Sequence, residues 1–167
     1  MDRPGQLRIL GIDPGLNITG YGVIDAGQGR VVEAGVIRMG SRQSTEVRLC
    51  ELFDGVVDVI ESLNPDCMAV EDLYSHYERP KTAIIMGHAR GVILLAAKQR
   101  GLTVNSYAAT KVKSVTTGNG RASKSQMQMA VCRQLNLPTV PDPPDVADAL
   151  AIALCHEHHF AGQKFQV

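Results

Sequence analysis

The sequence predicts an α/β fold in which a five-stranded mixed sheet is flanked by helices. Three short β-prone segments near the start, joined by brief turns, indicate an antiparallel meander. Two further apolar strands then alternate with segments of helical periodicity, and right-handed crossovers would set these strands parallel to the first. With 167 residues, the chain is expected to form one domain, residues 1–167, with a real core.

The meander is predicted from three runs of apolar and β-branched residues, at Ile9–Ile12, Ile18–Ile24 and Arg30–Met39. Pro14 and Gly15 separate the first two runs. Because proline cannot donate to a sheet ladder and Pro-Gly strongly favours a turn, these two strands are expected to form a hairpin.

The later elements follow from spacing and from helix stop signals. In the first helix, apolar residues recur three and four apart, and Asn64-Pro65 ends it. Pro144 suits the first turn of the last helix, where a missing N–H costs nothing. Helices are predicted at Thr45–Leu63, Thr82–Gln99, Ala108–Val115, Ser123–Leu135 and Asp145–Phe160, and strands at Cys67–Val70 and Leu102–Tyr107.

A formal net charge of zero conceals a basic middle third of the chain. Between Arg79 and Val140 there is no Asp or Glu. Ordinary surface helices mix charges of both signs, so an acid-free stretch favours a phosphate-binding surface over simple solvation. The basic residues of this stretch are Arg79, Lys81, Arg90, Lys98, Arg100, Lys111, Lys113, Arg121, Lys124 and Arg133.

Two carboxylates stand at the ends of predicted strands. Asp13 follows the first strand and Glu71 follows the fourth. If the two strands are parallel neighbours, both acids lie at the same edge of the sheet. Asp13 on its own could equally begin the turn through an Asx hydrogen bond, and the segment alone leaves both interpretations open.

Asp145 and Asp148 stand three residues apart at the start of the last helix, on one face of its first turn. Acids in a first turn also favour the helix dipole, whatever the function. Together with the strand-end acids, however, they would form a four-carboxylate site that is unfavourable when empty. Oxygen ligands without His or Cys pairs suit Mg²⁺ or Mn²⁺, and two such ions can drive phosphodiester hydrolysis.

Several other classes of protein are disfavoured. The four cysteines lie far apart, which gives neither a zinc site nor a disulfide framework. The Gly-rich loop before Lys124 lacks the preceding glycine of a P-loop, since Ser123 stands there. No apolar run approaches a membrane span, so a soluble, cytoplasmic protein is expected. His156, His158 and His159, late in the last helix, are expected to be exposed or to cap its end.

The chain resembles the RuvC family of bacterial Holliday-junction resolvases, within the ribonuclease H-like superfamily. The matching motifs are G-I-D-P-G-x-x-x-T-G-Y-G-V-I, A-V-E, G-x-A-R-G-V, K-V-K with K-S-Q, and D-x-A-D-A-L-A-I-A. They occur in family order at Gly11–Ile24, Ala69–Glu71, Gly87–Val92, Lys111–Gln126 and Asp145–Ala153.

This resemblance implies a homodimer that nicks two symmetric strands of a four-way DNA junction with two Mg²⁺ or Mn²⁺ ions per site, in recombination and repair. It also implies association with a branch-migration helicase complex of the RuvA–RuvB type. Asp13, Glu71, Asp145 and Asp148 fall on the family's metal-binding carboxylates. The implied DNA contacts are Lys111, Lys113, Arg121, Lys124 and Tyr74, the last at a position where the family usually has a base-stacking Phe.

Three other functions compete with this one. A ribonuclease H-like fold could act on RNA or an RNA–DNA hybrid, because fold does not determine substrate. A non-catalytic junction-binding module would keep the basic surface without the chemistry. The Asp-Pro-Gly turn near Thr19 also resembles a phosphate-binding hairpin of actin-like ATPases, but those need two large domains, and this chain is too short.

Overall fold

The computed structural model describes residues 6–15, 17–73 and 79–164, and within them the sheet has the order β3-β2-β1-β4-β5. Strands β1, β2 and β3 form the expected antiparallel meander, and β4 and β5 run parallel to β1. The strands are β1 (Arg8–Asp13), β2 (Ile18–Asp25), β3 (Arg30–Arg38), β4 (Cys67–Glu71) and β5 (Thr103–Tyr107). The predicted fold class is therefore confirmed.

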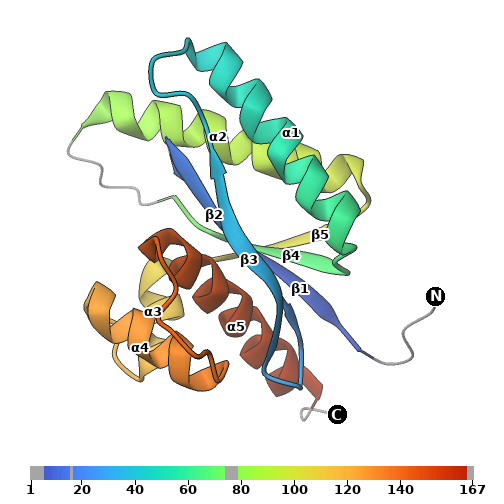
Figure 1. Ribbon diagram of the computed structural model, residues 1–167, viewed down its shortest axis with the longest axis vertical. Helices are drawn as coiled ribbons and strands as arrows, with labels where there is room; N and C mark the ends of the chain where they lie inside the picture. Colours follow the sequence, from blue (N-terminus) through green and yellow to red (C-terminus); the bar gives the residue numbers. More distant parts are fainter. Residues whose placement is uncertain (1–5, 16, 74–78, 165–167) are drawn as a thin grey trace.

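Helices cover both faces of the sheet (Figure 1). One face packs against α1 and α2, and the other packs against α5, with α3 and α4 lying outside it. The helices are α1 (Thr45–Leu63), α2 (Pro80–Gln99), α3 (Ala109–Thr117), α4 (Lys124–Gln134) and α5 (Pro144–Lys164). Among the residues described, no helix is both long and apolar enough to cross a membrane.

Element boundaries depart from the sequence prediction at helix ends. Helix α2 begins two residues early, at Pro80, because proline fits the first helical position. Helix α3 continues to Thr117 and ends where Gly118 adopts a left-handed conformation, with φ of 78°. Helix α5 continues past Phe160 to Lys164.

The position of His156 on α5 overturns the prediction that this residue is exposed or caps the helix end. This residue lies on the buried face of the helix, 5% exposed, and its Nδ1 is 2.7 Å from the Tyr107 hydroxyl. Burial lowers the pKa of His156, and His159 lowers it further. Only His158 and His159 are exposed as expected. The Tyr107–His156 hydrogen bond joins α5 to the edge strand β5.

Glycines on β1 and β2 let α5 lie directly against the sheet. A Cβ at Gly11 would stand 2.1 Å from the carbonyl oxygen of Ala149, and one at Gly20 would stand 2.1 Å from that of Asp145. Both neighbours are backbone atoms of α5, so no side chain can turn aside to make room. The missing side chains thus bring the start of α5 close to the strand that ends at Asp13.

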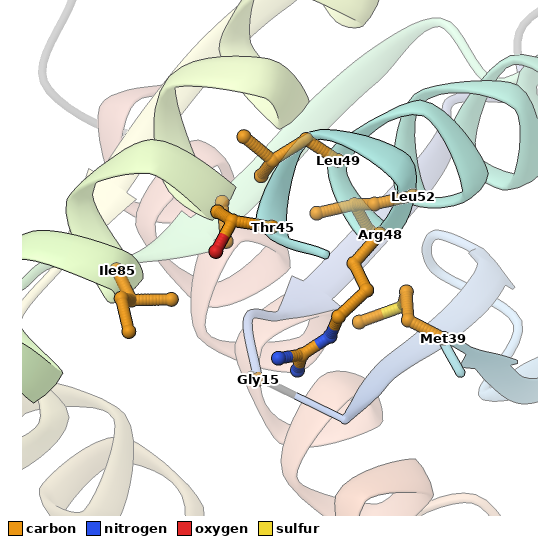
Figure 2. A pocket seen from close by; sticks show the side chains of 8 residues that line it. Gly15, Met39, Thr45, Arg48, Leu49, Leu52 and Ile85 are labelled. Atoms are coloured by element: carbon orange, nitrogen blue, oxygen red, sulfur yellow. The ribbon is translucent and has the colours of Figure 1, made fainter. Parts of the chain in front are cut away.

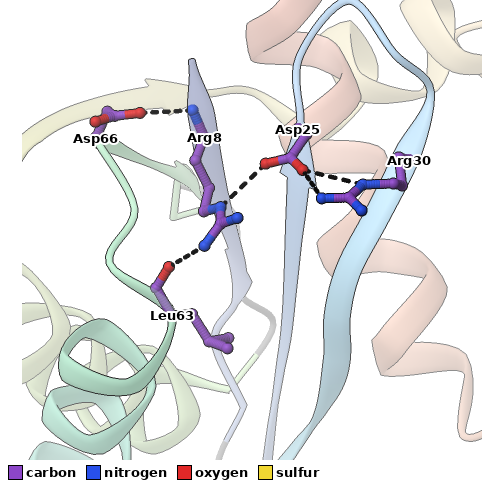
Figure 3. A network of polar contacts seen from close by, with 5 residues as sticks. All are labelled: Arg8, Asp25, Arg30, Leu63 and Asp66. Atoms are coloured by element: carbon purple, nitrogen blue, oxygen red, sulfur yellow. Dashed lines mark hydrogen bonds and ion pairs between the residues drawn. The ribbon is translucent and has the colours of Figure 1, made fainter. Parts of the chain in front are cut away.

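The opposite end of β1 is held by a buried ion-pair network (Figure 3). Asp25 is 1% exposed and accepts hydrogen bonds from Arg8 Nε at 3.0 Å and from Arg30 Nε at 3.1 Å. Arg8 also donates to the Leu63 carbonyl at 2.6 Å, which ties β1 to the end of α1. Burial opposes ionisation of Asp25, but the hydrogen bonds from Arg30 and Arg8 outweigh it and hold its pKa below the usual range.

Replacing Arg8 with methionine is expected to destabilise the fold by about 3 kcal/mol at pH 7, because it leaves a buried carboxylate with one partner fewer. A lowered pKa means that the stabilisation is present above the unfolded value, near 3.8, and is lost as pH falls. Urea unfolding of both proteins should therefore show a gap that narrows below about pH 4. A gap unchanged with pH would contradict this role for the Arg8–Asp25 pair.

Candidate active site

The carboxylates of Asp13 and Glu71 lie side by side at one edge of the sheet. Parallel pairing sets Ile12 opposite Val70, so the next residue of each strand is the acid. The two groups are close enough that Glu71 raises the pKa of Asp13. The strand order that the sequence predicts is sufficient to bring this pair together.

Helix α5 contributes the third acid. Asp148 lines the same cavity as Asp13 and Glu71. Asp145 does not line that cavity, and its backbone rests against Gly20 on β2. It is nevertheless close enough to raise the pKa of both Asp13 and Asp148. The structure thus places three predicted acids around one cavity and the fourth at its margin.

The cavity measures about 280 Å³, and two lysines line it together with the acids. Lys113 comes from α3, and Lys124 is the first residue of α4. Ser123 and Gln126 form a reciprocal capping box that starts α4 at this point, so the position of Lys124 is fixed by its own helix start. Apolar side chains, among them Val112 and Ile152, complete the lining.

The acids of the cavity resist ionisation together. Burial raises the pKa of Asp13 to about 8, with further increases from Asp148, Glu71 and Asp145, against a lowering by Lys124. Burial likewise raises the pKa of Glu71 and of Asp148, while Lys113 opposes the rise in each. A bound cation would reduce the repulsion between these carboxylates and favour their ionised forms.

The donor set fits a hard divalent cation. All the candidate ligands are carboxylate oxygens, which suit Mg²⁺ or Mn²⁺ rather than zinc. In the described part of the chain, no three His, Cys, Asp or Glu side chains already stand in a metal-holding group. Binding a cation would therefore draw the Asp13, Glu71 and Asp148 side chains inward.

Two of the other predicted DNA contacts, Lys111 and Arg121, are not part of the cavity lining. Lys111 is exposed and lies near Cys155 on α5, where its charge acts on that thiol. Arg121 is exposed in the loop between α3 and α4, and its backbone N–H donates to the Asn119 side chain at 2.9 Å. Tyr74 lies outside the described residues.

The turn after Asp13 is held by residues that the sequence did not single out. The Thr19 hydroxyl accepts a hydrogen bond from the Gly15 N–H at 3.3 Å. Arg48, from α1, donates to the Asn17 side chain at 2.9 Å, and Figure 2 shows its guanidinium pointing to the turn at Gly15. A small cavity of about 10 Å³, room for one water molecule, lies beside it. No local pattern distinguishes Arg48 from the other polar residues of α1.

The sheet order, the acidic strand ends and the acids at the start of α5 define the ribonuclease H-like class. Residues 9–156 match the model of the family described as crossover junction endodeoxyribonuclease RuvC. The chain therefore belongs to the crossover junction endodeoxyribonuclease RuvC family.

Individual relatives agree with this assignment. The enzyme of that name from Rhodopirellula baltica is 56% identical over 92% of this chain and 88% of its own. The structure of T. thermophilus RuvC in complex with Holliday junction substrate superposes with a TM-score of 0.87, at 31% identity, over 94% of this chain and 96% of that one. The yeast mitochondrial Holliday junction resolvase, at 15% identity and a TM-score of 0.66, over 96% of this chain and 81% of that one, shares the fold.

Proposed function

We propose that this protein is a structure-specific DNA endonuclease that resolves four-way junctions by paired symmetric nicks in recombination and repair. The observation that carries the proposal is that one cavity is lined both by the acids Asp13, Glu71 and Asp148 and by the lysines Lys113 and Lys124. Membership of the crossover junction endodeoxyribonuclease RuvC family supports the choice of substrate. We also propose that residues 1–167 form one nuclease domain, because both hydrophobic clusters pack on one sheet.

The acids would hold two Mg²⁺ or Mn²⁺ ions, with Asp13 and Glu71 supplying the strand-end oxygens and Asp145 and Asp148 those of α5. When bound, such ions supply an activated water and stabilise the leaving oxygen of a phosphodiester. Asp13 keeps a proton in the metal-free protein because its pKa is raised. It must lose that proton before its carboxylate can bind a cation.

The lysines would bind the substrate rather than the metal. Lys113 and Lys124 line the same cavity as the acids, and a phosphate group entering it would bring its own negative charge. Lys111 and Arg121 would contact phosphates farther along the same strand, outside the cavity. We further propose that Tyr74 stacks on a base at the junction, since tyrosine offers the aromatic face that stacking needs.

Changing Lys113 or Lys124 to alanine is expected to slow junction cleavage by roughly 10- to 100-fold, because each loses a charge-assisted contact to phosphate. Both side chains reach solvent, so the free energy of unfolding should change by less than about 0.5 kcal/mol. Single-turnover cleavage and urea unfolding measure the two effects. Lys98→Ala, on the exposed surface of α2, is the matched control. Wild-type rates in both variants would contradict the assigned roles.

We propose that the working unit is a homodimer, because paired symmetric cuts need two sites related by a two-fold axis. Helix α2 offers a surface for a second copy. Ile84, His88, Gly91 and Leu95 follow one another at helical spacing and are all exposed, with Ile84 at 60% and Leu95 at 52%. Association with a branch-migration helicase complex of the RuvA–RuvB type is proposed from family membership alone.

A panel of DNA substrates tests the proposal. A mobile four-way junction, a linear duplex and an RNA–DNA hybrid would each be incubated with Mg²⁺, Mn²⁺ or chelator. Paired nicks in the junction alone, lost with chelator, are expected. Cutting of the hybrid with an intact junction would assign the protein to RNA, and tight junction binding with no cutting under any condition would favour a binding module.

A further inference from the structure

Arg90, on α2, lies in the G-x-A-R-G-V segment, which has no role in the chemistry proposed above. Its Nη2 donates to the Ser106 hydroxyl at 2.6 Å and to the Asp72 carboxylate at 3.1 Å. Its Nε donates to the backbone carbonyl of Glu71 at 3.4 Å. The guanidinium of Arg90 therefore links α2 to the end of β4, at Glu71 and Asp72, and to β5, at Ser106.

These partners surround the point where the chain leaves the sheet. Glu71 is the last residue of β4 and pairs with Tyr107 on β5. One further hydrogen bond, from the Asp72 N–H to the Tyr107 carbonyl at 2.9 Å, extends the ladder. Beside it, Arg90 donates to the Asp72 carboxylate and to the Glu71 carbonyl. The direction of the Glu71 side chain depends on a backbone that this arginine holds.

The Arg90 side chain is largely buried at the boundary between α2 and the sheet. Arg90 follows Ala89, which is 3% exposed in the core between α2 and the sheet, and the Arg90 side chain is only 18% exposed. A planar guanidinium can satisfy several acceptors in fixed directions at once, whereas a lysine ammonium acts as a point charge. The three acceptors on two strand ends match that geometry.

We propose that Arg90 is a positioning residue for Glu71, which sets the Glu71 carboxylate for metal binding by fixing the carboxyl ends of β4 and β5. This inference rests on the proposed function, in which Glu71 is a metal ligand. Arg90 is not part of the lining of the acid cavity, so it would act on a metal ion through Glu71. Its loss should weaken metal binding more than it weakens junction binding or the fold.

Arg100 provides a matched control. It stands at the C-terminal end of the same helix, and its Nε pairs with Glu61 Oε1 on α1 at 2.8 Å; neither residue lines the cavity of the acids. Arg90→Met and Arg100→Met each remove one guanidinium and one ion pair from α2. Only the first removes contacts to the end of β4.

The test compares wild type, Arg90→Met, Arg90→Lys and Arg100→Met as full-length proteins. Calorimetric titration with Mn²⁺ gives metal affinity without DNA, and junction binding in chelator gives DNA affinity. For Arg90→Met we expect at least tenfold weaker Mn²⁺ binding with junction affinity within twofold of wild type. Arg90→Lys should recover part of the loss, and Arg100→Met should match wild type.

Equal Mn²⁺ affinity in Arg90→Met and Arg100→Met would overturn the inference, even if Arg90→Met melts at a lower temperature. If Arg90→Met does not fold, Ser106→Ala decides, with at least threefold weaker Mn²⁺ binding expected and an unchanged affinity overturning the proposal. Absence of Mn²⁺ binding by wild type would instead overturn the proposed function, and the inference with it.

Discussion

Replacing Asp13 with asparagine is expected to slow junction cleavage by roughly 10²–10³-fold or more, the range observed when one preorganised charge-stabilising group is lost. Asp148, Glu71 and Asp145 each raise the pKa of Asp13, so we expect its carboxylate to be the ligand that cations in the cavity share. Single-turnover cleavage in saturating Mn²⁺ measures the effect. Asp54→Asn, which changes an exposed acid on α1, is the control.

The same substitution should stabilise the metal-free protein at alkaline pH. Because the pKa of Asp13 is raised from 3.8 to about 8, the folded protein retains a proton that the unfolded chain has lost. Stability is therefore full below about pH 3.8 and declines as pH rises through 8. Asparagine removes this decline, so Asp13→Asn should exceed wild type at pH 9 by at least ~1.4 kcal/mol, the equivalent of one pKa unit.

Urea unfolding in chelator at pH 5 and pH 9 measures this gap, and added Mn²⁺ should close it by stabilising wild type alone. If Asp13→Asn were less stable than wild type at pH 9 without metal, the acids could not be mutually unfavourable. If Mn²⁺ stabilised both proteins equally, Asp13 would not be a ligand.

A methyl group at Gly11 is expected to destabilise the protein by about 3 kcal/mol and to remove most of its activity. The added Cβ would lie 2.1 Å from the Ala149 carbonyl oxygen and 2.8 Å from the Ala153 backbone nitrogen, so α5 itself must move. Asp148 precedes Ala149 and would move with it, away from Asp13. Urea unfolding and junction cleavage by Gly11→Ala test both consequences.

Gly162→Ala is the matched control for that substitution. It lies near the end of the same helix, and a Cβ there would meet nothing within 4 Å. It should leave the fold as stable as wild type or slightly more stable, because alanine favours helix more than glycine does. A Gly11→Ala protein with wild-type stability and cleavage would show that α5 does not depend on close contact with β1.

The sequence is sufficient to predict the sheet and the position of Asp13 beside Glu71. Both follow from one physical regularity, that parallel strands end at the same edge of a sheet and that right-handed crossovers make these strands parallel. The approach of α5 is less predictable. A glycine in a strand signals close backbone contact in general, but not which helix makes it.

Two of the predicted DNA contacts, Lys111 and Lys113, lie in different surroundings because of their spacing along α3. Lys111 and Lys113 are two residues apart in α3, and residues at that spacing do not share a helix face. Lys113 therefore lines the cavity, whereas Lys111 lies near Cys155. DNA binding by Lys111, Arg121 and Tyr74 stays a prediction.

Arg48 and Arg90 could not be found from sequence, because their partners lie on turns or strand ends far along the chain. Arg48 bonds a residue 31 positions away, and Arg90 bonds residues 16 to 19 positions away. His156 was mispredicted for a different reason. His156 follows the buried Ile152 and Ala153 by four and three residues, so it lies on the buried face of α5 although it comes late in the helix.

A crystal structure of the protein soaked in Mn²⁺, with anomalous differences recorded at the manganese absorption edge, tests the central claim most directly. We expect manganese peaks in the cavity, bound by carboxylate oxygens of Asp13, Glu71 and Asp148, with Asp145 completing the site. Crystals of Asp13→Asn should lose at least one peak. Manganese bound only elsewhere, with the cavity acids unliganded at saturating Mn²⁺, would contradict the account.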